Sequence, residues 1–124
     1  MTSVRYIVDD AQAAAAFYRE QLGFELQAQP APSFAILTRG DLRLLLSEPT
    51  GPGGAAQQMP DGRRPEPGGW NRFQIEVEDV AARADELRRA GVSLRGEVVQ
   101  GRGGAQVLVE DPSGNPVELF EPAR

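Results

Sequence analysis

Apolar and polar positions in the first half of the chain predict one helix flanked by strands. Residues 4–8 alternate between apolar and polar side chains and are rich in β-forming residues, so a strand is expected there. Asp10 is a suitable helix N-cap, the following segment to Leu22 has helical composition, and Gly23 is placed to end the helix. Further strands are predicted at residues 24–29, which Pro30 and Pro32 are expected to end, and at 34–38 and 42–46, which a short turn joins.

The second half shows the same kind of pattern. Residues 73–77 alternate and predict a strand, and Asp79 is placed to cap a helix that runs to about residue 90. Val80, Ala84 and Leu87 fall on one face of that helix, and Gly91 follows its end. Further strands are predicted at 92–99, 105–110 and 117–120, the last two joined by a turn at 111–116.

Matching features recur in the same order in the two halves. They are a capping Asp, a Gly after the helix and a five-residue stretch near the end of each half. The matched features are Asp10 with Asp79, Gly23 with Gly91, and residues 45–49 (LLSEP) with 118–122 (ELFEP). Three landmarks in the same order predict a tandem repeat of one strand–helix–strands unit.

This repeat predicts an α+β fold in a single domain, residues 1–124. The first βαβββ module is expected at 1–49 and the second at 70–124. The residues between them, 50–69, are dense in Gly and Pro and show almost no periodicity, which is typical of a long loop. A structureless loop of this length in a compact domain usually has a function or is disordered.

Composition removes several classes of function. The 124 residues contain no His and no Cys, so no Ser-His-Asp or Cys-His catalytic group and no Cys/His zinc site can form. The net charge is −5 and the basic residues are scattered, which argues against nucleic-acid binding. The sequence has no apolar run long enough for a membrane span and no signal peptide, so a cytoplasmic protein without a membrane partner is expected.

Two motifs resemble those of a known family. Residues 10–24, with Phe17-Tyr18 and Leu22-Gly23-Phe24, and residues 110–119 (EDPSGNPVEL) are similar to the first and closing signatures of the vicinal oxygen chelate superfamily. This superfamily contains glyoxalases, ring-cleaving dioxygenases and bleomycin resistance proteins. The resemblance implies the glyoxalase/bleomycin-resistance fold, in which paired βαβββ modules form cupped mixed sheets around a ligand cavity, and it implies a homodimer.

The resemblance also implies where metal-dependent members hold their metal. Those positions correspond here to Ser3, Leu45, Arg72 and Glu118. A Ser hydroxyl is a weak ligand, Leu is none and Arg repels a cation, so Glu118 alone is suited to a divalent ion. We therefore expect no metal and no other cofactor, and the isomerase, lyase and dioxygenase chemistries of the family come into doubt together.

Side-chain alternation along the strands predicts which residues face the cup. The face opposite the helices is expected to carry Arg5, Arg43 and a set of aromatic, aliphatic and polar side chains. The predicted ligand-binding residues are Phe34, Leu45, Trp70, Asn71, Arg72, Gln74, Glu118 and Phe120, with no catalytic residue among them. Such a mixture is usual in pockets for organic ligands.

Each of these residues also has a structural interpretation. Glu118 could simply pair with Arg72, Trp70 could be a core or interface residue, and Phe34 and Phe120 could fill the floor of the cup. Arg5 and Arg43 could be solvated. The loop could be a crossover between the modules.

Two functions are consistent with this sequence. The first is a non-catalytic protein that sequesters an aromatic or apolar natural product and so confers antibiotic resistance. The alternative is a glyoxalase-like lyase or isomerase, or another enzyme acting on a small metabolite, with Glu118 as the base and Arg72 stabilising an anion. Unchanged ligand after binding would favour the first, and a changed product mass the second.

Overall fold

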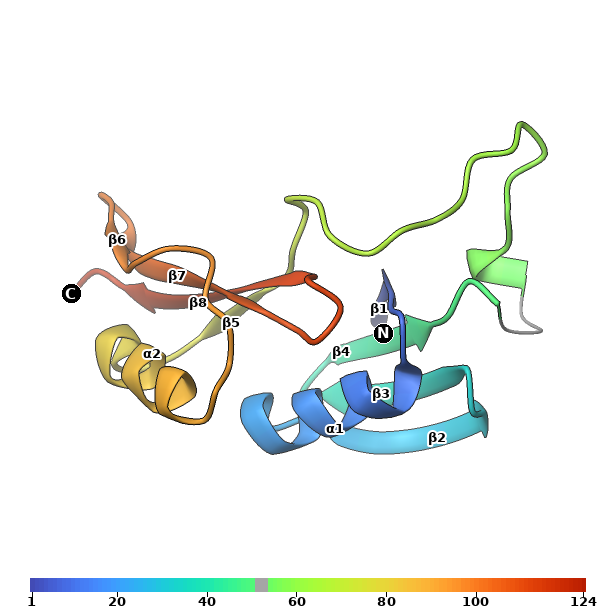
Figure 1. Ribbon diagram of the computed structural model, residues 1–124. Helices are drawn as coiled ribbons and strands as arrows, with labels where there is room; N and C mark the ends of the chain where they lie inside the picture. The colour runs from blue at the N-terminus through green and yellow to red at the C-terminus, as the bar shows by residue number, and fades with distance from the viewer. Residues whose placement is uncertain (51–53) are drawn as a thin grey trace. The chain divides into compact units, whose positions relative to one another are not determined.

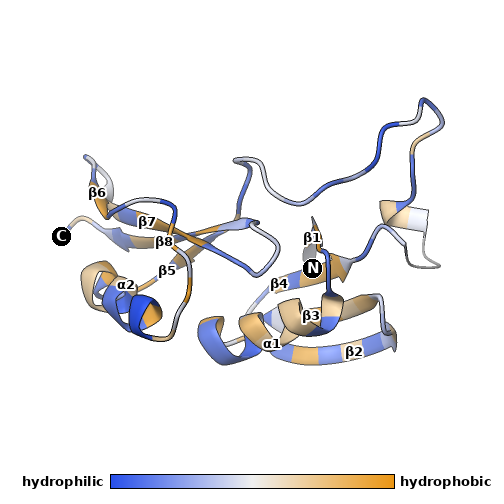
Figure 2. Cartoon of the chain, in the orientation of Figure 1, coloured by the Kyte–Doolittle hydropathy of each residue, from blue (hydrophilic) through white to orange (hydrophobic). Residues whose placement is uncertain are grey.

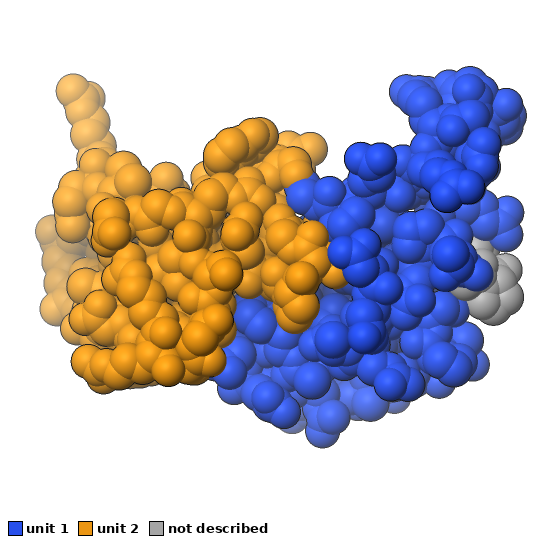
Figure 3. All heavy atoms as spheres, viewed as in Figure 1, with its two compact units in different colours: residues 1–68 blue, residues 69–124 orange. Residues whose placement is uncertain are grey.

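The computed structural model describes residues 1–50 and 54–124 and contains two compact units, Met1–Gly68 and Gly69–Arg124. Figure 3 colours these units separately, and each is described by itself. Each unit holds a four-stranded mixed sheet and one α-helix (Figure 1). The predicted α+β fold with two βαβββ modules is confirmed. No helix in the described part of the chain has the length and apolar character needed to cross a membrane.

The first unit places its helix on one face of the sheet. Strand β1 pairs in parallel with β4, and β3 pairs antiparallel with β4 and β2, which gives the order β1-β4-β3-β2. Tyr18 of α1 and Leu37, Leu44 and Leu46 of the sheet are fully buried and form the core. The elements are β1 (Thr2–Ile7), α1 (Ala11–Leu22), β2 (Glu25–Ala31), β3 (Phe34–Arg39) and β4 (Leu42–Ser47).

The ends of α1 follow the sequence prediction. The Asp10 carboxylate accepts hydrogen bonds from the backbone N–H groups of Gln12 and Ala13, both at 3.0 Å, which satisfies two amides that have no partner inside the helix. Gly23 takes a left-handed conformation with φ of +73°, which glycine adopts without a steric cost.

The second unit repeats this arrangement. Strand β5 pairs in parallel with β8, β7 pairs antiparallel with β8 and β6, and the order is β5-β8-β7-β6. Asp79 caps α2 by accepting from the N–H of Ala82 at 3.0 Å. Leu87, Val109 and Leu119 lie in the core. The elements are β5 (Gln74–Glu76), α2 (Val80–Arg89), β6 (Val99–Gln100), β7 (Gly104–Glu110) and β8 (Pro116–Pro122).

A pair of glutamates extends the repeat to a side-chain contact. Glu48, just after β4, accepts a hydrogen bond at 2.9 Å from the backbone N–H of Ala11, the first residue of α1. Glu121, near the end of β8, accepts one at 2.9 Å from the N–H of Val80, the first residue of α2. Each carboxylate joins a strand to a helix N-terminus, where negative charge is favourable.

Two strand predictions need correction. Strand β2 continues through Pro30 to Ala31 instead of ending before the proline. It lies at the edge of its sheet, where a missing N–H is tolerated, and its pairing with β3 shifts register twice. Figure 2 shows hydrophobic and hydrophilic residues alternating along β2.

The predicted strand at residues 92–99 is wrong over most of its length. Only Val99 and Gln100 form a strand, β6, and Leu94 makes one isolated bridge to Val109. Gly96 has a φ of +95°, which turns the backbone away from an extended path.

Candidate functional site

The first sheet has one face covered by α1 and one more open face. Leu44 and Leu46 are fully buried under the helix, whereas the neighbouring Arg43 and Leu45 point the other way and are half-buried. Pairing aligns the open-face side chains in rows across the strands. The rows are Ser3–Arg43–Thr38, Arg5–Leu45–Ile36 and Ile7–Ser47–Phe34.

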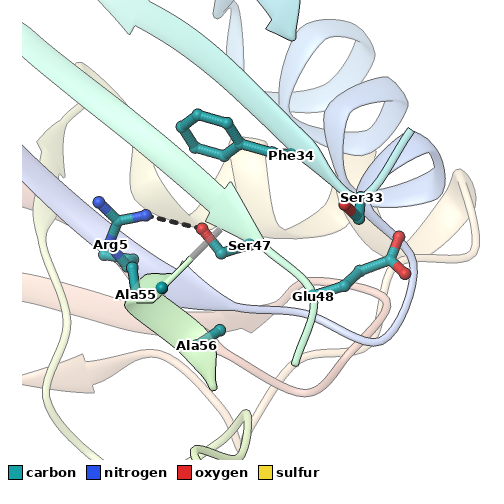
Figure 4. Close-up of a pocket in the computed structure, with 8 residues that line it drawn as sticks. Arg5, Ser33, Phe34, Ser47, Glu48, Ala55 and Ala56 are labelled. Atoms are coloured by element: carbon teal, nitrogen blue, oxygen red, sulfur yellow. Dashed lines mark hydrogen bonds between the residues drawn. The ribbon is translucent and has the colours of Figure 1, made fainter. Parts of the chain in front are cut away.

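A pocket of about 220 Å³ lies at one end of this open face (Figure 4). It contains Phe34 from the predicted site and part of the Gly/Pro-rich loop, which forms a short 3₁₀ helix, Gly54–Ala56. The lining residues are Arg5, Ser33, Phe34, Ser47, Glu48, Gly54, Ala55 and Ala56. Residues 51–53 of the loop lie outside the described residues.

The polar groups of the pocket come mainly from β1 and β4. Arg5 Nη1 donates a hydrogen bond to Ser47 Oγ at 2.8 Å, and its guanidinium carbon lies 5.8 Å from the centre of the Phe34 ring. Ser47 is buried, whereas Arg5 is exposed. The pocket therefore offers a cation, a hydroxyl and an aromatic ring from three neighbouring positions.

In the second unit, Glu118 is enclosed by hydrogen-bond donors. Arg72 reaches its Oε1 with Nε at 3.0 Å and Nη2 at 2.9 Å, and Gln74 Nε2 donates to Oε2 at 2.6 Å. Gln106, with its amide nitrogen turned toward the carboxylate, donates to both oxygens at 3.0 and 3.1 Å. The sequence interpretation that Glu118 pairs with Arg72 agrees with this geometry. The pair is part of a larger network.

The residues at the metal positions of the resemblance do not fit a divalent metal. The two carboxylate oxygens of Glu118 accept hydrogen bonds from three side chains, and one of these is the cationic Arg72. In the first unit the corresponding residues are Ser3, whose hydroxyl is a weak ligand, and Leu45, which has no ligand atom in its side chain. Within residues 1–50 and 54–124 no three acidic side chains come together as a metal-binding group.

Trp70 lies on the surface of the second unit. Its side chain is 68% exposed, so it does not belong to the core. The Arg95 guanidinium stacks on its ring at 4.6 Å. Arg95 is held in turn by Glu110 at 3.0 Å and by the carbonyl oxygens of Gly69 at 2.6 Å and Gly114 at 2.9 Å. Trp70 thus presents an aromatic surface on a fixed cationic support.

The predicted site residues fall into two sets. Phe34 and Leu45 belong to the first unit, and the other six belong to the second. Arg72, Gln74 and Glu118 are in contact with one another, Asn71 is exposed, and Phe120 is half-buried opposite Gln106 in β7.

Sequence reasoning missed three polar residues. Ser47 and Gln106 follow from strand alternation once the hairpin registers are known, since they pair with Phe34 and Phe120. Arg95 lies in a segment predicted as a strand, and no local pattern indicates that it supports Trp70.

Comparison with known proteins identifies the family of this chain. Residues 1–119 match the family model described as Glyoxalase/Bleomycin resistance protein/Dioxygenase superfamily. No curated protein matches the chain. Among solved structures, lactoylglutathione lyase from Agrobacterium tumefaciens is 25% identical with a TM-score of 0.75, and the match covers 98% of this chain and 92% of that chain.

Two antibiotic-binding proteins are also similar in structure. TnmS3, an antibiotic-binding protein from Streptomyces sp. CB03234, is 26% identical with a TM-score of 0.71, covering 98% of this chain and 93% of that chain. The bleomycin-binding protein from Streptomyces verticillus, solved with copper(II)-bleomycin, is 24% identical with a TM-score of 0.63, covering 98% and 95%. At 24% identity, the similarity to the bleomycin-binding protein indicates a shared fold alone.

Proposed function

Because the chain belongs to the glyoxalase/bleomycin resistance protein/dioxygenase superfamily, we propose that it is a non-catalytic protein that binds an aromatic or apolar small molecule without a metal. Its role is antibiotic resistance by sequestration, in the cytoplasm. The similarity to TnmS3, described as an antibiotic-binding protein, supports binding as the function.

The hydrogen bonding of Glu118 is the main observation that supports this proposal. It is the one residue at the metal positions that suits a metal, and Arg72, Gln74 and Gln106 already donate to both of its oxygens. A substrate would have to compete with these three donors for the oxygens of Glu118. Sequestration needs only shape, stacking and a few hydrogen bonds.

The proposed contacts with the ligand are those predicted from the sequence. Aromatic and apolar contacts come from Phe34, Leu45, Trp70 and Phe120, and polar contacts from Asn71, Arg72, Gln74 and Glu118. The pocket beside Phe34 supports the assignment in the first unit, and the exposed ring of Trp70 supports it in the second.

A thermal-shift screen against aromatic natural products tests the proposal directly. A ligand present at 100 times its dissociation constant stabilises the folded protein by about 2.7 kcal/mol. Mass spectrometry should recover the ligand unchanged and in a stoichiometric amount. A ligand recovered with a changed mass would instead support the second candidate, a glyoxalase-like lyase or isomerase, which the similarity to lactoylglutathione lyase favours.

Trp70→Ala is expected to weaken binding of such a ligand by about tenfold or more, because ring stacking contributes roughly 0.5–1.5 kcal/mol beyond surface burial. The melting temperature should hardly change, since Trp70 is exposed. Isothermal titration calorimetry and thermal unfolding measure the two effects, and Trp70→Phe is the control that keeps a stacking ring. Unchanged affinity, or unfolding of the alanine variant, would assign Trp70 a packing role.

We also propose that the protein is a homodimer, as the family resemblance implies. Light scattering at micromolar concentration should give about twice the mass of the 13.4 kDa chain. A monomer mass at that concentration would contradict this.

A further inference from the structure

We propose that the pocket of the first unit binds an anionic group on the ligand, such as a carboxylate, sulfonate or phenolate. Arg5 and Ser47 are the anchors of this group, and Phe34 contacts the ring that carries it. This inference rests on the proposed function and narrows its ligand class from aromatic to aromatic and acidic.

The first argument is the charge of the open face. Arg5 has no acidic side chain within ion-pair distance among the described residues, and its hydrogen-bond partner Ser47 is neutral. Arg43, one row further along β4, also lacks an ion pair there, and its Nε is buried without a hydrogen-bond partner. A chain with a net charge of −5 thus keeps two unneutralised guanidinium groups on adjacent strands of one face.

The second unit provides an internal comparison. Its cation at the corresponding face, Arg72, is neutralised by Glu118 at 2.9 Å. Glu118 corresponds to Leu45 in the first unit. Arg5 pairs in register with Leu45 and so takes the place of Gln74, which pairs with Glu118, whereas Ser3 takes the place of Arg72. The first unit therefore has an arginine, Arg5, beside the apolar Leu45 where the second unit has its carboxylate, and a carboxylate from outside would satisfy this arginine.

Glu48 also lines the pocket and could supply that negative charge itself. Its carboxylate is instead held by the N–H of Ala11 at 2.9 Å, at the positive end of α1. Figure 4 shows Arg5 turned toward Ser47, with the Glu48 carboxylate pointing away from both. The Glu48 carboxylate is therefore bound to the N-terminus of α1 and does not neutralise Arg5, which remains available to a ligand.

The size of the pocket fits part of a ligand. At about 220 Å³ it is smaller than the roughly 300–1,000 Å³ of pockets that enclose a drug-sized molecule. One acid-bearing ring can contact Phe34 while its anionic group reaches Arg5 and the Ser47 hydroxyl. Charge-assisted hydrogen bonds of this kind are stronger than neutral ones and fix orientation.

Two fluorescent probes with the same ring system test this inference. Anilinonaphthalene sulfonate carries an anionic group, and phenylnaphthylamine is the same skeleton without it. The wild-type protein should bind the sulfonate about tenfold more tightly or better, as expected for a hydrogen-bonded ion pair. Arg5→Gln should remove this preference and leave binding of the neutral probe unchanged, and raised salt should weaken the sulfonate complex alone.

Two control variants separate the site from overall charge and from folding. Arg64→Gln removes the same charge from an exposed position outside the pocket and should keep the preference. Arg5→Lys keeps a cation and should retain part of it. Equal binding of both probes by the wild-type protein, or loss of the preference in Arg64→Gln, would overturn this inference and leave the proposed function standing. If neither probe binds, both fail.

Discussion

Replacing Gly104 with alanine is expected to lower the free energy of unfolding by about 3 kcal/mol or more. A Cβ at this position would lie 2.1 Å from the carbonyl oxygen of Glu121 and 2.9 Å from Cα of Pro122, both on the paired strand β8. Gly104 also has a φ of +150°, which residues with a side chain rarely adopt. These are backbone atoms at the end of β8, so they can move aside only by breaking the last pairs of the β7–β8 ladder. Urea denaturation measures the loss.

The neighbouring glycine is the matched control. A Cβ on Gly103 would approach nothing closer than Cζ of Phe120 at 4.0 Å, and this residue does not need a positive φ. Gly103→Ala should therefore change stability by less than about 0.5 kcal/mol. Equal stability of the two variants would show that the close approach of β7 and β8 at Gly104 is not maintained in solution.

Glu118→Ala is expected to destabilise the protein by about 3 kcal/mol, the lower end of the range for removing one partner of a buried ion pair. The loss arises because Arg72, Gln74 and Gln106 would each keep a donor without its acceptor. It is not expected to be larger, since the Arg72 side chain is still 27% exposed and can be hydrated. Chemical denaturation of the purified variant gives this value.

Two further variants distinguish the network from simple burial. Glu118→Gln keeps the shape and one acceptor and should cost less than the alanine variant. Combining Arg72→Met with Glu118→Leu removes both charges and should recover much of the stability, as apolar replacements of buried pairs often do. A double variant that is as unstable as Glu118→Ala would show that packing around position 118 is the source of the loss.

The helices and most strands could be predicted because local chemistry decides them. Asp10 and Asp79 accept from helix amides as expected of N-caps, and apolar alternation correctly separates the buried Leu44 and Leu46 from Leu45 between them. Prediction failed in two places, one where non-local pairing overrides a local signal and one where a single glycine turns the backbone. Pro30 lies within an edge strand, and Gly96 interrupts a segment with strand-like composition.

The candidate site could be predicted only in part, because its polar partners come from distant strands. Arg72 and Glu118 follow from the family resemblance, but Gln106 joins them through the β7–β8 register, which no sequence pattern specifies. Arg5 likewise lacks an ion pair because the Glu48 carboxylate is hydrogen-bonded to Ala11 of α1, a contact between residues far apart in the chain. Identifying which charges stay available requires these three-dimensional partners.

The irregular strand β2 has a consequence for aggregation. Exposed sheet edges are templates on which strands of other molecules can add, and proline and bulges are natural means of preventing this. At the β2 edge, Pro30 lacks the N–H that an added strand would need, and the two register shifts disturb the spacing of the remaining groups. Continuous strand-by-strand growth of the sheet into fibrils is therefore disfavoured along this side.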